Sequence, residues 1–131
     1  PGEFARLADA NAGRSVEQRA AGAAELCRRD ASGKTIVVLK GCHTIVADVR
    51  RYAVNRTGNP SMATGGTGDC LTGVIAGLLA QGLSSWDAAR LGTHVHGLAG
   101  DLAAEQLGQI SLIASDLLSY LPAAFEQDAV G

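Results

Sequence analysis

A glycine-rich segment separates two parts of this chain that have different structural preferences. Residues 56–68 contain four glycines and one proline, a composition that interrupts both helices and strands. Before the segment, Thr35–Lys40 is β-branched and apolar, which is typical of a strand covered on both faces. After it, Asp69–Gln81 has the composition of a buried helix, and Gly82 is a helix stop signal. The segment therefore leads the chain from strands into the N-terminus of a helix.

Local signals predict the other elements upstream of the glycine-rich segment. Phe4, Leu7 and Ala8 would lie on one face of a helix, which predicts a short helix over Glu3–Ala10. Ser15 and Gln18 have the spacing of a capping box, which predicts a second helix running to about Asp30. Two further strands are expected, over Thr44–Ala47 and Arg51–Asn55, around a turn at residues 48–50.

Helices dominate the part of the chain that follows the glycine-rich segment. Ser84 or Ser85 predicts the start of a long helix that Gly108 ends, and Ser115 predicts the start of the last helix, which Pro122 would shorten or kink. Strands followed by covering helices indicate an α/β layered domain. Three strands make a poor sheet for so many apolar helices, so we expect further strands before Pro1 and interpret the chain as half of a domain.

Composition argues against several classes of protein. The net charge of −2 and the 4% of aromatic residues do not favour a nucleic-acid-binding domain, which would use positive charge or base stacking. The longest apolar run, Cys70–Ala80, is far shorter than the ~20 residues of a membrane helix, and no export signal opens the chain. The cysteines are odd in number and lack C-x-x-C spacing, as expected for buried free thiols in a reducing compartment. We expect a cytoplasmic protein without nucleic-acid or membrane partners.

The glycine-rich segment has the chemistry of an anion site. The first turn of a helix leaves about four backbone N–H groups without partners and carries roughly half a positive charge. Glycines remove the Cβ atoms that would keep an anion away from these groups. The segment lacks both the Gly-Lys-[Ser/Thr] of a P-loop and a G-x-G-x-x-G after a strand. Either it binds a phosphate chain, or its glycines only form a tight turn.

Asp69 follows the segment directly and carries the first acidic group of the predicted helix. A carboxylate cannot help to bind a phosphate, because like charges repel. It can accept a proton from a hydroxyl that attacks the phosphate, while the amides stabilise the charge on the phosphoryl oxygens. The pattern therefore favours phosphoryl transfer to an alcohol; the alternative is an acid that only stabilises the first helical turn.

Several motifs together resemble one enzyme family. The run Asn59–Asp69, NPSMATGGTGD, is similar to the signature of the ADP- or ATP-dependent NAD(P)H-hydrate dehydratases, which belong to the ribokinase-like superfamily. Four other stretches resemble the family in the same order: Pro1–Leu7, Val38–Gly41, His96–Asp101 and Ala114–Leu117. The resemblance implies a ribokinase-like three-layer α/β/α fold, of which residues 1–131 form the C-terminal part of a single catalytic domain.

The resemblance also implies a repair reaction. Hydrated NADH or NADPH carries a hydroxyl on C6 of its nicotinamide ring. ADP or ATP, with Mg²⁺ bridging the phosphates, would phosphorylate that hydroxyl and make it a good leaving group. Elimination would then restore the reduced nicotinamide. Homo-oligomers and an NAD(P)H-hydrate epimerase or the preceding half of the domain are the partners that we expect.

The same resemblance assigns residues to the site. Asp69 would be the catalytic base, and Glu3 and Asp69 would contact the substrate. No set of residues forms an obvious protein-only magnesium cage. Lys40 can reach a phosphate as a point charge or remain a solvated lysine at a strand end. The nucleotide site would be lined by Lys40, Gly41, Cys42, His43, Thr44, Asn59, Met62, Ala63, Thr64, Gly65, Gly66, Thr67 and Gly68.

Two pairs of polar residues that are not assigned to the site have structural interpretations. His94 and His96 are two residues apart, so on a helix they face different directions and do not share a metal ion; His96 is expected to pack or hydrogen-bond inside the domain. Asp101 and Asp116 are interpreted as exposed or capping acids. Glycines in the same long helix indicate close helix packing or a local break: Gly92, Gly97 and Gly100.

Two other functions are compatible with the sequence. A ribokinase-like kinase of a vitamin precursor or a sugar would share the nucleotide loop and the Asp69 base. A catalytically inactive fragment would serve as a nucleotide-binding or assembly module, because half a sheet leaves an unpaired edge. Motifs over Met62–Gly66 and Pro1–Leu7 favour the dehydratase.

Overall fold

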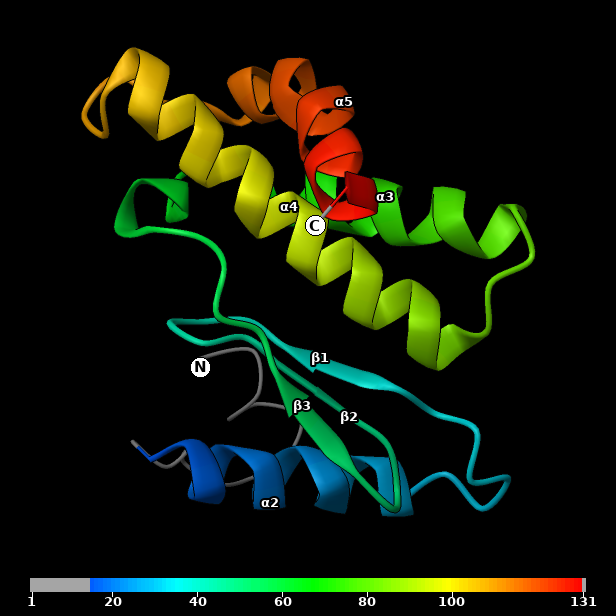
Figure 1. Cartoon of the computed structure of the whole chain (residues 1–131). Helices are drawn as coiled ribbons and strands as arrows, with labels where there is room; N and C mark the ends of the chain where they lie inside the picture. Colours follow the sequence, from blue (N-terminus) through cyan, green and yellow to red (C-terminus); the bar gives the residue numbers. More distant parts are fainter. Residues whose placement is uncertain (1–14, 131) are drawn as a thin grey trace. The chain divides into compact units, whose positions relative to one another are not determined.

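The computed structural model describes residues 15–130 of the chain (Figure 1). The helix expected over Glu3–Ala10 lies outside the described residues. The chain divides into two compact units, one reaching to Asn55 and one beginning at Arg56. The boundary therefore coincides with the start of the glycine-rich segment.

The first unit places helix α2 (Val16–Arg28) against a small sheet. The sheet consists of β1 (Val37–Leu39), β2 (Ile45–Ala47) and β3 (Tyr52–Val54), in the order β1-β2-β3. Its core consists of small and aliphatic residues: Ala20, Ala23, Cys27, Leu39, Ile45 and Ala47.

The capping box predicted for α2 is confirmed. The Ser15 hydroxyl accepts from the N–H of Gln18 at 3.1 Å, and the Gln18 side chain accepts from the N–H of Ser15 at 3.4 Å. The turn at residues 48–50 is confirmed as well, because the Asp48 carboxylate accepts from the N–H groups of Arg50 and Arg51, both at 2.8 Å.

The strand environment differs from the one that the sequence predicts. All the described strand pairs are antiparallel, and Val37 and Val38 of β1 are half-buried. The expectation of a strand covered on both faces is therefore wrong for these two residues. An antiparallel sheet tolerates one partly exposed face, so an apolar run alone does not require two covering layers.

The second unit is helical. The 3₁₀ helix η1 (Pro60–Met62) precedes the helices α3 (Thr67–Ala80), α4 (Ser85–Leu107) and α5 (Ala114–Val130). Helix α4 packs against both α3 and α5 (Figure 1). The core of this unit lies mainly between α4 and α5: Val95, Ala99, Ala103, Leu112, Leu117 and Ala124.

Most helix ends of the second unit agree with the sequence. The Ser84 hydroxyl accepts from the N–H of Asp87 at 3.1 Å and caps α4, which Gly108 ends with a φ of 79°. Gly82 follows α3 with a φ of 96°. The N–H of Gly82 donates to the carbonyl oxygen of Leu79 at 3.0 Å, and the N–H of Leu83 donates to the carbonyl oxygen of Leu78 at 3.3 Å. These are the two hydrogen bonds of a Schellman motif.

The predicted start of α5 is wrong, and so is the shortening at Pro122, whereas the kink at Pro122 stays a prediction. The helix begins before Ser115, because the Asp116 carboxylate accepts from the N–H of Ile113 at 2.9 Å and organises the first turn itself. Pro122 does not end the helix, which continues to Val130. A proline removes one intrahelical hydrogen bond, and the apolar contacts of α5 with α4 hold the helix together around it.

Close helix packing explains the glycines of α4. A Cβ atom on Gly92 would lie 2.7 Å from the side chain of Ile75 in α3, and one on Gly97 would lie 2.7 Å from the carbonyl carbon of Thr57. Neither distance is compatible with a side chain. The helix is continuous through these positions, so the alternative of a local break is wrong.

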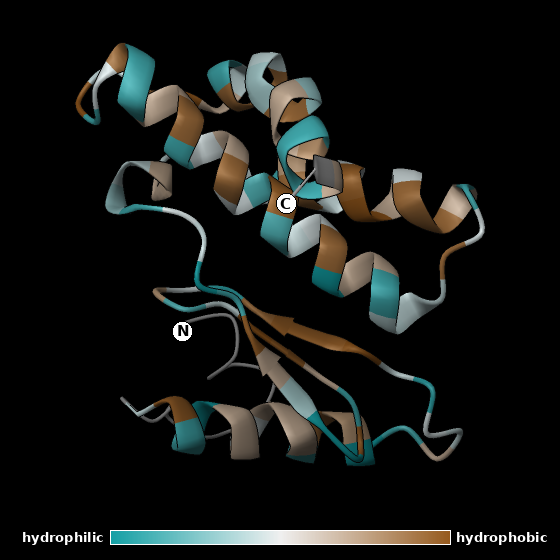
Figure 2. Cartoon of the chain, in the orientation of Figure 1, coloured by the Kyte–Doolittle hydropathy of each residue, from teal (hydrophilic) through white to brown (hydrophobic). Residues whose placement is uncertain are grey.

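Helix α3 is less buried than its composition predicts. Figure 2 shows that it is largely hydrophobic, yet Thr67, Leu71 and Leu78 are its only buried residues within the described chain. Leu79, for example, is 43% exposed. No described helix is both long and apolar enough to span a membrane.

The cysteines agree only in part with the expectation of buried thiols. Cys27 is buried, Cys70 is half-buried and Cys42 is exposed, and all are free. Burial raises the pKa of the Cys27 thiol, whose sulfur lies 3.4 Å from the carbonyl oxygen of Ala47. Cys27 is therefore a packing residue of the first unit.

Candidate functional site

The N-terminus of α3 offers backbone N–H groups that the helix itself does not use. Gly66 caps the helix in the left-handed conformation, with a φ of 89°. The first helical hydrogen bond runs from the N–H of Cys70 to the carbonyl of Gly66, at 3.1 Å. The N–H groups of Thr67, Gly68 and Asp69 therefore have no partner inside the helix. This geometry suits an anion.

Thr67 and His96 hold the start of α3 in place. The buried Thr67 hydroxyl lies 2.7 Å from the carbonyl oxygen of Met62 and 3.0 Å from that of Thr64. His96, 8% exposed, places its Nε2 atom 2.9 Å from the carbonyl oxygen of Thr67. The prediction that His96 hydrogen-bonds inside the domain is confirmed. These contacts use carbonyl oxygens and do not occupy the N–H groups of the helix start.

Asp101 anchors the first part of the glycine-rich segment. Its carboxylate accepts from the N–H of Gly58 at 2.9 Å and from the side-chain amide of Asn59 at 2.8 Å. The Asn59 side-chain oxygen in turn accepts from the N–H and the hydroxyl of Ser61, so Asn59 caps η1. The interpretation of Asp101 as an exposed or capping acid is wrong: it joins α4 to the loop.

Met62 fills the space beside Gly100. A Cβ atom on Gly100 would lie 2.8 Å from both Cγ and Cε of Met62, so α4 and the segment pack against each other through this glycine. Met62 is also packed against the core of the second unit. The side chains of Asn59 and Met62 are thus engaged inside the protein, whereas Ala63, Thr64 and Gly65 are exposed.

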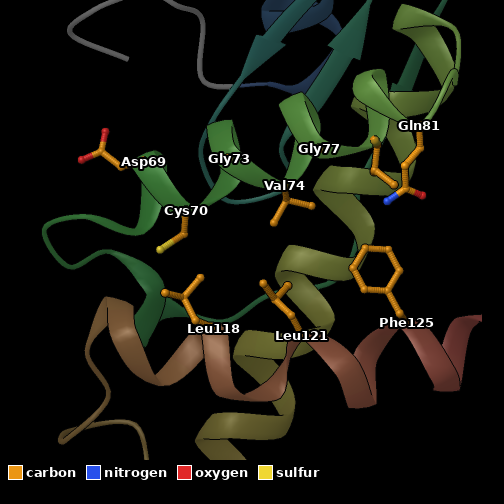
Figure 3. Close-up of a pocket in the computed structure, with 10 residues that line it drawn as sticks. Asp69, Cys70, Gly73, Val74, Gly77, Gln81, Leu118, Leu121 and Phe125 are labelled. Atoms are coloured by element: carbon orange, nitrogen blue, oxygen red, sulfur yellow. The ribbon is translucent and has the colours of Figure 1, made fainter.

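Asp69 lies in the first turn of α3 and is exposed. Figure 3 shows its carboxylate pointing into solvent, away from the groove between α3 and α5. It lies two residues beyond Thr67, on the same helix end as the N–H groups that have no partner inside the helix. An acceptor for a proton and a set of anion-binding donors are therefore neighbours.

The groove between α3 and α5 is a separate feature. Its volume is about 540 Å³, and Figure 3 shows Val74, Leu121 and Phe125 lining it. Asp69 lies at its rim and Gln81 at the other end. A mostly apolar groove does not suit a phosphate, so it does not replace the N-terminus of α3 as the anion site.

The turn after β1 carries the other group of predicted nucleotide-binding residues. Lys40 and Cys42 are exposed, and the Thr44 hydroxyl donates to the carbonyl of Gly41 at 3.2 Å. His43 adopts a φ of 58°, an unusual value for a residue with a side chain. The turn is therefore a tightly constrained loop with an exposed lysine.

Arg19 of α2 hydrogen-bonds to the backbone of this turn. Its guanidinium donates to four backbone carbonyl oxygens. Nη1 lies 2.8 Å from the carbonyl oxygen of Cys42 and 3.2 Å from the carbonyl oxygen of His43. Nη2 lies 3.3 Å from the carbonyl oxygen of Leu39 and 3.4 Å from the carbonyl oxygen of Lys40. Sequence reasoning missed this role and that of Asp101, because both depend on partners far away in the chain.

The structure brings the predicted residues together in two groups. Asn59–Asp69 are gathered by the second unit, and Lys40–Thr44 by the first. Glu3 lies outside the described residues. Within residues 15–130, no group of three His, Cys, Asp or Glu residues could hold a metal ion. His94 pairs instead with Asp128, at 3.2 Å.

Comparison with known proteins places this chain in a family. A family model described as NAD(P)H-hydrate dehydratase matches residues 1–123. The bifunctional NAD(P)H-hydrate repair enzyme Nnr of Moorella thermoacetica is 48% identical over 124 residues, which are 93% of this chain and 23% of that protein. The enzyme of the same name from Thermofilum pendens is 48% identical over 126 residues, or 94% of this chain and 23% of its own length. The chain thus spans about a quarter of these relatives.

Solved structures give the same result at the level of the fold. The ADP/ATP-dependent NAD(P)H-hydrate dehydratase of Bacillus subtilis, co-crystallized with ATP/Mg²⁺, has a TM-score of 0.85 and 33% identity, with 97% of this chain and 45% of that chain covered. A ribokinase-like superfamily protein of Enterococcus faecalis has a TM-score of 0.74 and 28% identity, with 95% and 42% covered. The expectation of a ribokinase-like α/β fold is confirmed, and the chain belongs to the NAD(P)H-hydrate dehydratase family.

Proposed function

We propose that this chain carries part of the active site for the ADP- or ATP-dependent dehydration of hydrated NADH and NADPH. The match of the family model over residues 1–123 supports this reaction more than any other observation. The N-terminus of α3 agrees with it, since N–H donors for a phosphoryl group and the exposed Asp69 carboxylate lie side by side.

In the proposed mechanism, Asp69 removes the proton from the C6 hydroxyl of the hydrate. The hydroxyl oxygen then forms a bond to the terminal phosphorus of the nucleotide, and the bond from that phosphorus to the departing nucleotide breaks. The N–H groups of Thr67 and Gly68 stabilise the charge on the transferred phosphoryl oxygens. Loss of phosphate and of a ring proton restores the reduced nicotinamide.

The family resemblance assigns nucleotide contacts to both groups of predicted residues, one in each unit. Lys40 offers a positive charge to a phosphate from the turn after β1. Gly65, Gly66 and Gly68 allow close approach of the phosphates to the backbone. Mg²⁺ would be held chiefly by phosphate oxygens and water, because the described residues form no metal cage.

The remaining parts of the proposal concern the whole protein. We propose that residues 1–131 are the C-terminal part of one catalytic domain, in agreement with the 45% coverage of the dehydratase from Bacillus subtilis. Glu3 would contact the substrate. A homo-oligomer in the cytoplasm that works with an NAD(P)H-hydrate epimerase completes the proposal, and the bifunctional relatives support the last point.

The direct test follows the recovery of NADH absorbance from purified NADH hydrate in the presence of Mg²⁺ with ADP, with ATP or with no nucleotide. We expect recovery only with a nucleotide. Phosphorylation of a vitamin alcohol or a sugar without any action on the hydrate would contradict the proposal and identify a kinase. Nucleotide binding without turnover, restored by adding the rest of the catalytic domain, would identify this chain as one part of the enzyme.

A further inference from the structure

The contact between Arg19 and the turn after β1 joins one side chain to four backbone groups. The acceptors of its guanidinium are the carbonyl oxygens of residues 39, 40, 42 and 43. Arg19 is half-buried on α2. One side chain thus fixes both arms of the turn, on either side of Gly41.

The shape of the turn fits this contact closely. A Cβ atom on Gly41 would lie 2.7 Å from Nη2 of Arg19, so the guanidinium lies directly against the glycine. The planar fork of an arginine donates in several fixed directions at once, which the single nitrogen of a lysine cannot do. Arg19 therefore gathers carbonyls that lie on different sides of the turn.

The contact also determines which backbone groups the turn can offer to a ligand. Carbonyl oxygens carry partial negative charge and would repel a nucleotide phosphate. Because these carbonyl oxygens accept from the Arg19 guanidinium, a phosphate that approached the turn would meet carbonyls whose negative charge is offset by a cation. His43, with its φ of 58°, is held in its strained conformation by the same contact, since its carbonyl is one of the four acceptors.

We infer that Arg19 is a positioning residue for the nucleotide: it organises the turn over Leu39–His43 so that Lys40 and the backbone of the turn are ready to bind phosphate. This inference rests on the proposed function, and it adds a residue that does not itself touch the nucleotide. A turn that is ordered before binding loses less entropy on binding. Removal of Arg19 should therefore weaken nucleotide affinity and leave the phosphoryl-transfer step unchanged.

The test compares R19Q and R19K with R28Q as the matched control. Arg28 lies on the same helix and pairs only with Glu25 in the described chain, at 2.9 Å, on an exposed surface. Calorimetric titration with ADP and Mg²⁺ should give a Kd that is about tenfold higher for R19Q and unchanged for R28Q. R19K should restore the affinity only in part, because it keeps the charge and loses the fork.

Two further readouts separate positioning from general stability. Where the hydrate is turned over, R19Q should raise the KM for the nucleotide and leave kcat unchanged. The amide NMR signals of Gly41 and His43 should move in R19Q and not in R28Q. An R19Q or R19K variant that is folded and binds ADP as tightly as the unsubstituted chain would overturn the inference. Failure of the unsubstituted chain to bind ADP or ATP would instead overturn the proposed function, and the inference with it.

Discussion

The start of α3 depends on a backbone conformation that a side chain makes costly. Gly66 has a φ of 89°, and a Cβ atom there would also lie 3.1 Å from that of Ala114. We expect G66A to lower the free energy of unfolding by about 1–2 kcal/mol, the usual cost of a left-handed conformation for a residue with a Cβ. Urea denaturation measures this loss.

Gly65 provides the matched control for Gly66. It has no positive φ, and a Cβ atom would meet nothing within 4 Å. G65A should therefore change the free energy of unfolding by less than about 0.5 kcal/mol. Equal losses for the two variants would show that the conformation of Gly66 is not what organises the start of α3.

Asp69 is the residue on which the proposed chemistry depends most. We expect D69N to lower kcat about 10²–10⁴-fold, the usual contribution of general base catalysis, while the Kd for ADP stays the same or falls because a negative charge has gone. The assay is NADH recovery under saturating ADP.

Asp87 is the matched control, because it lies in the first turn of α4 as Asp69 lies in that of α3. D87N should leave kcat unchanged. A D69N variant that keeps full activity would remove Asp69 from the mechanism.

At the scale of elements, the sequence predicts helix ends well where the chemistry is local. Ser15, Ser84 and Gly82 act on groups within about four residues of themselves, so a short window of sequence contains all the information. The prediction that Ser115 begins α5 is wrong because Asp116, one residue later, makes the hydrogen bond that organises the first turn. The start of α3 at Thr67 instead of Asp69 is a similar local error.

Contacts between elements could not be predicted in this way. Arg19 acts on carbonyls that are 20 to 24 residues away, and Asp101 on groups that are 42 and 43 residues away. No periodicity or motif in the sequence indicates contacts at these separations. The sequence therefore indicates which loops carry the site, but not which side chains hold those loops in shape.

The link between α4 and the glycine-rich segment can be tested at Asp101. D101A leaves the N–H of Gly58 and the Asn59 side-chain amide without their acceptor, so we expect a loss of about 1–3 kcal/mol in the free energy of unfolding. Faster amide hydrogen exchange at Gly58 and Ser61 should accompany it. The exposed Glu105, one turn further along α4, is the control, and E105Q should change neither. Unchanged exchange at Gly58 in D101A would contradict the anchoring role.

The connection from α2 to β1 predicts a pH dependence of the first unit. Hydrogen bonds, first of all from the Ser32 hydroxyl at 2.6 Å and also from Thr35, hold the pKa of the Asp30 carboxyl well below its ordinary value of 3.8. A depressed pKa in the folded state means that the carboxylate stabilises the fold above pH 3.8 and that this contribution is lost as the pH falls further.

The measurement compares the chain with D30N by amide hydrogen exchange of β2, which reports on the first unit. The difference in free energy of opening should be constant near neutral pH and should shrink as the pH falls below 3.8. E17Q removes an exposed carboxylate from the first turn of α2 and controls for the change in charge. A difference that grows with acidity would contradict the assignment to Asp30.

At the scale of the whole molecule, the predicted nucleotide contacts are divided between the two units. Lys40–Thr44 belong to the first and Asn59–Gly68 to the second. A ligand that binds only the folded state stabilises it by about 2.7 kcal/mol at a hundredfold excess over Kd. If one nucleotide contacts both segments, the backbone amides of both should become protected from hydrogen exchange together.

Amide hydrogen exchange with saturating ADP and Mg²⁺ tests this expectation. We expect slower exchange in residues 40–44 and 63–69, with the loop over residues 109–113 as an internal control that stays unchanged. Adenosine, which lacks the phosphates, should protect the N-terminus of α3 much less, because the anion is what its N–H groups bind. Protection confined to one of the two segments would assign the nucleotide to a single unit and remove the other group of residues from the site. Equal protection by adenosine and ADP would show instead that the N-terminal amides of α3 do not bind the phosphates.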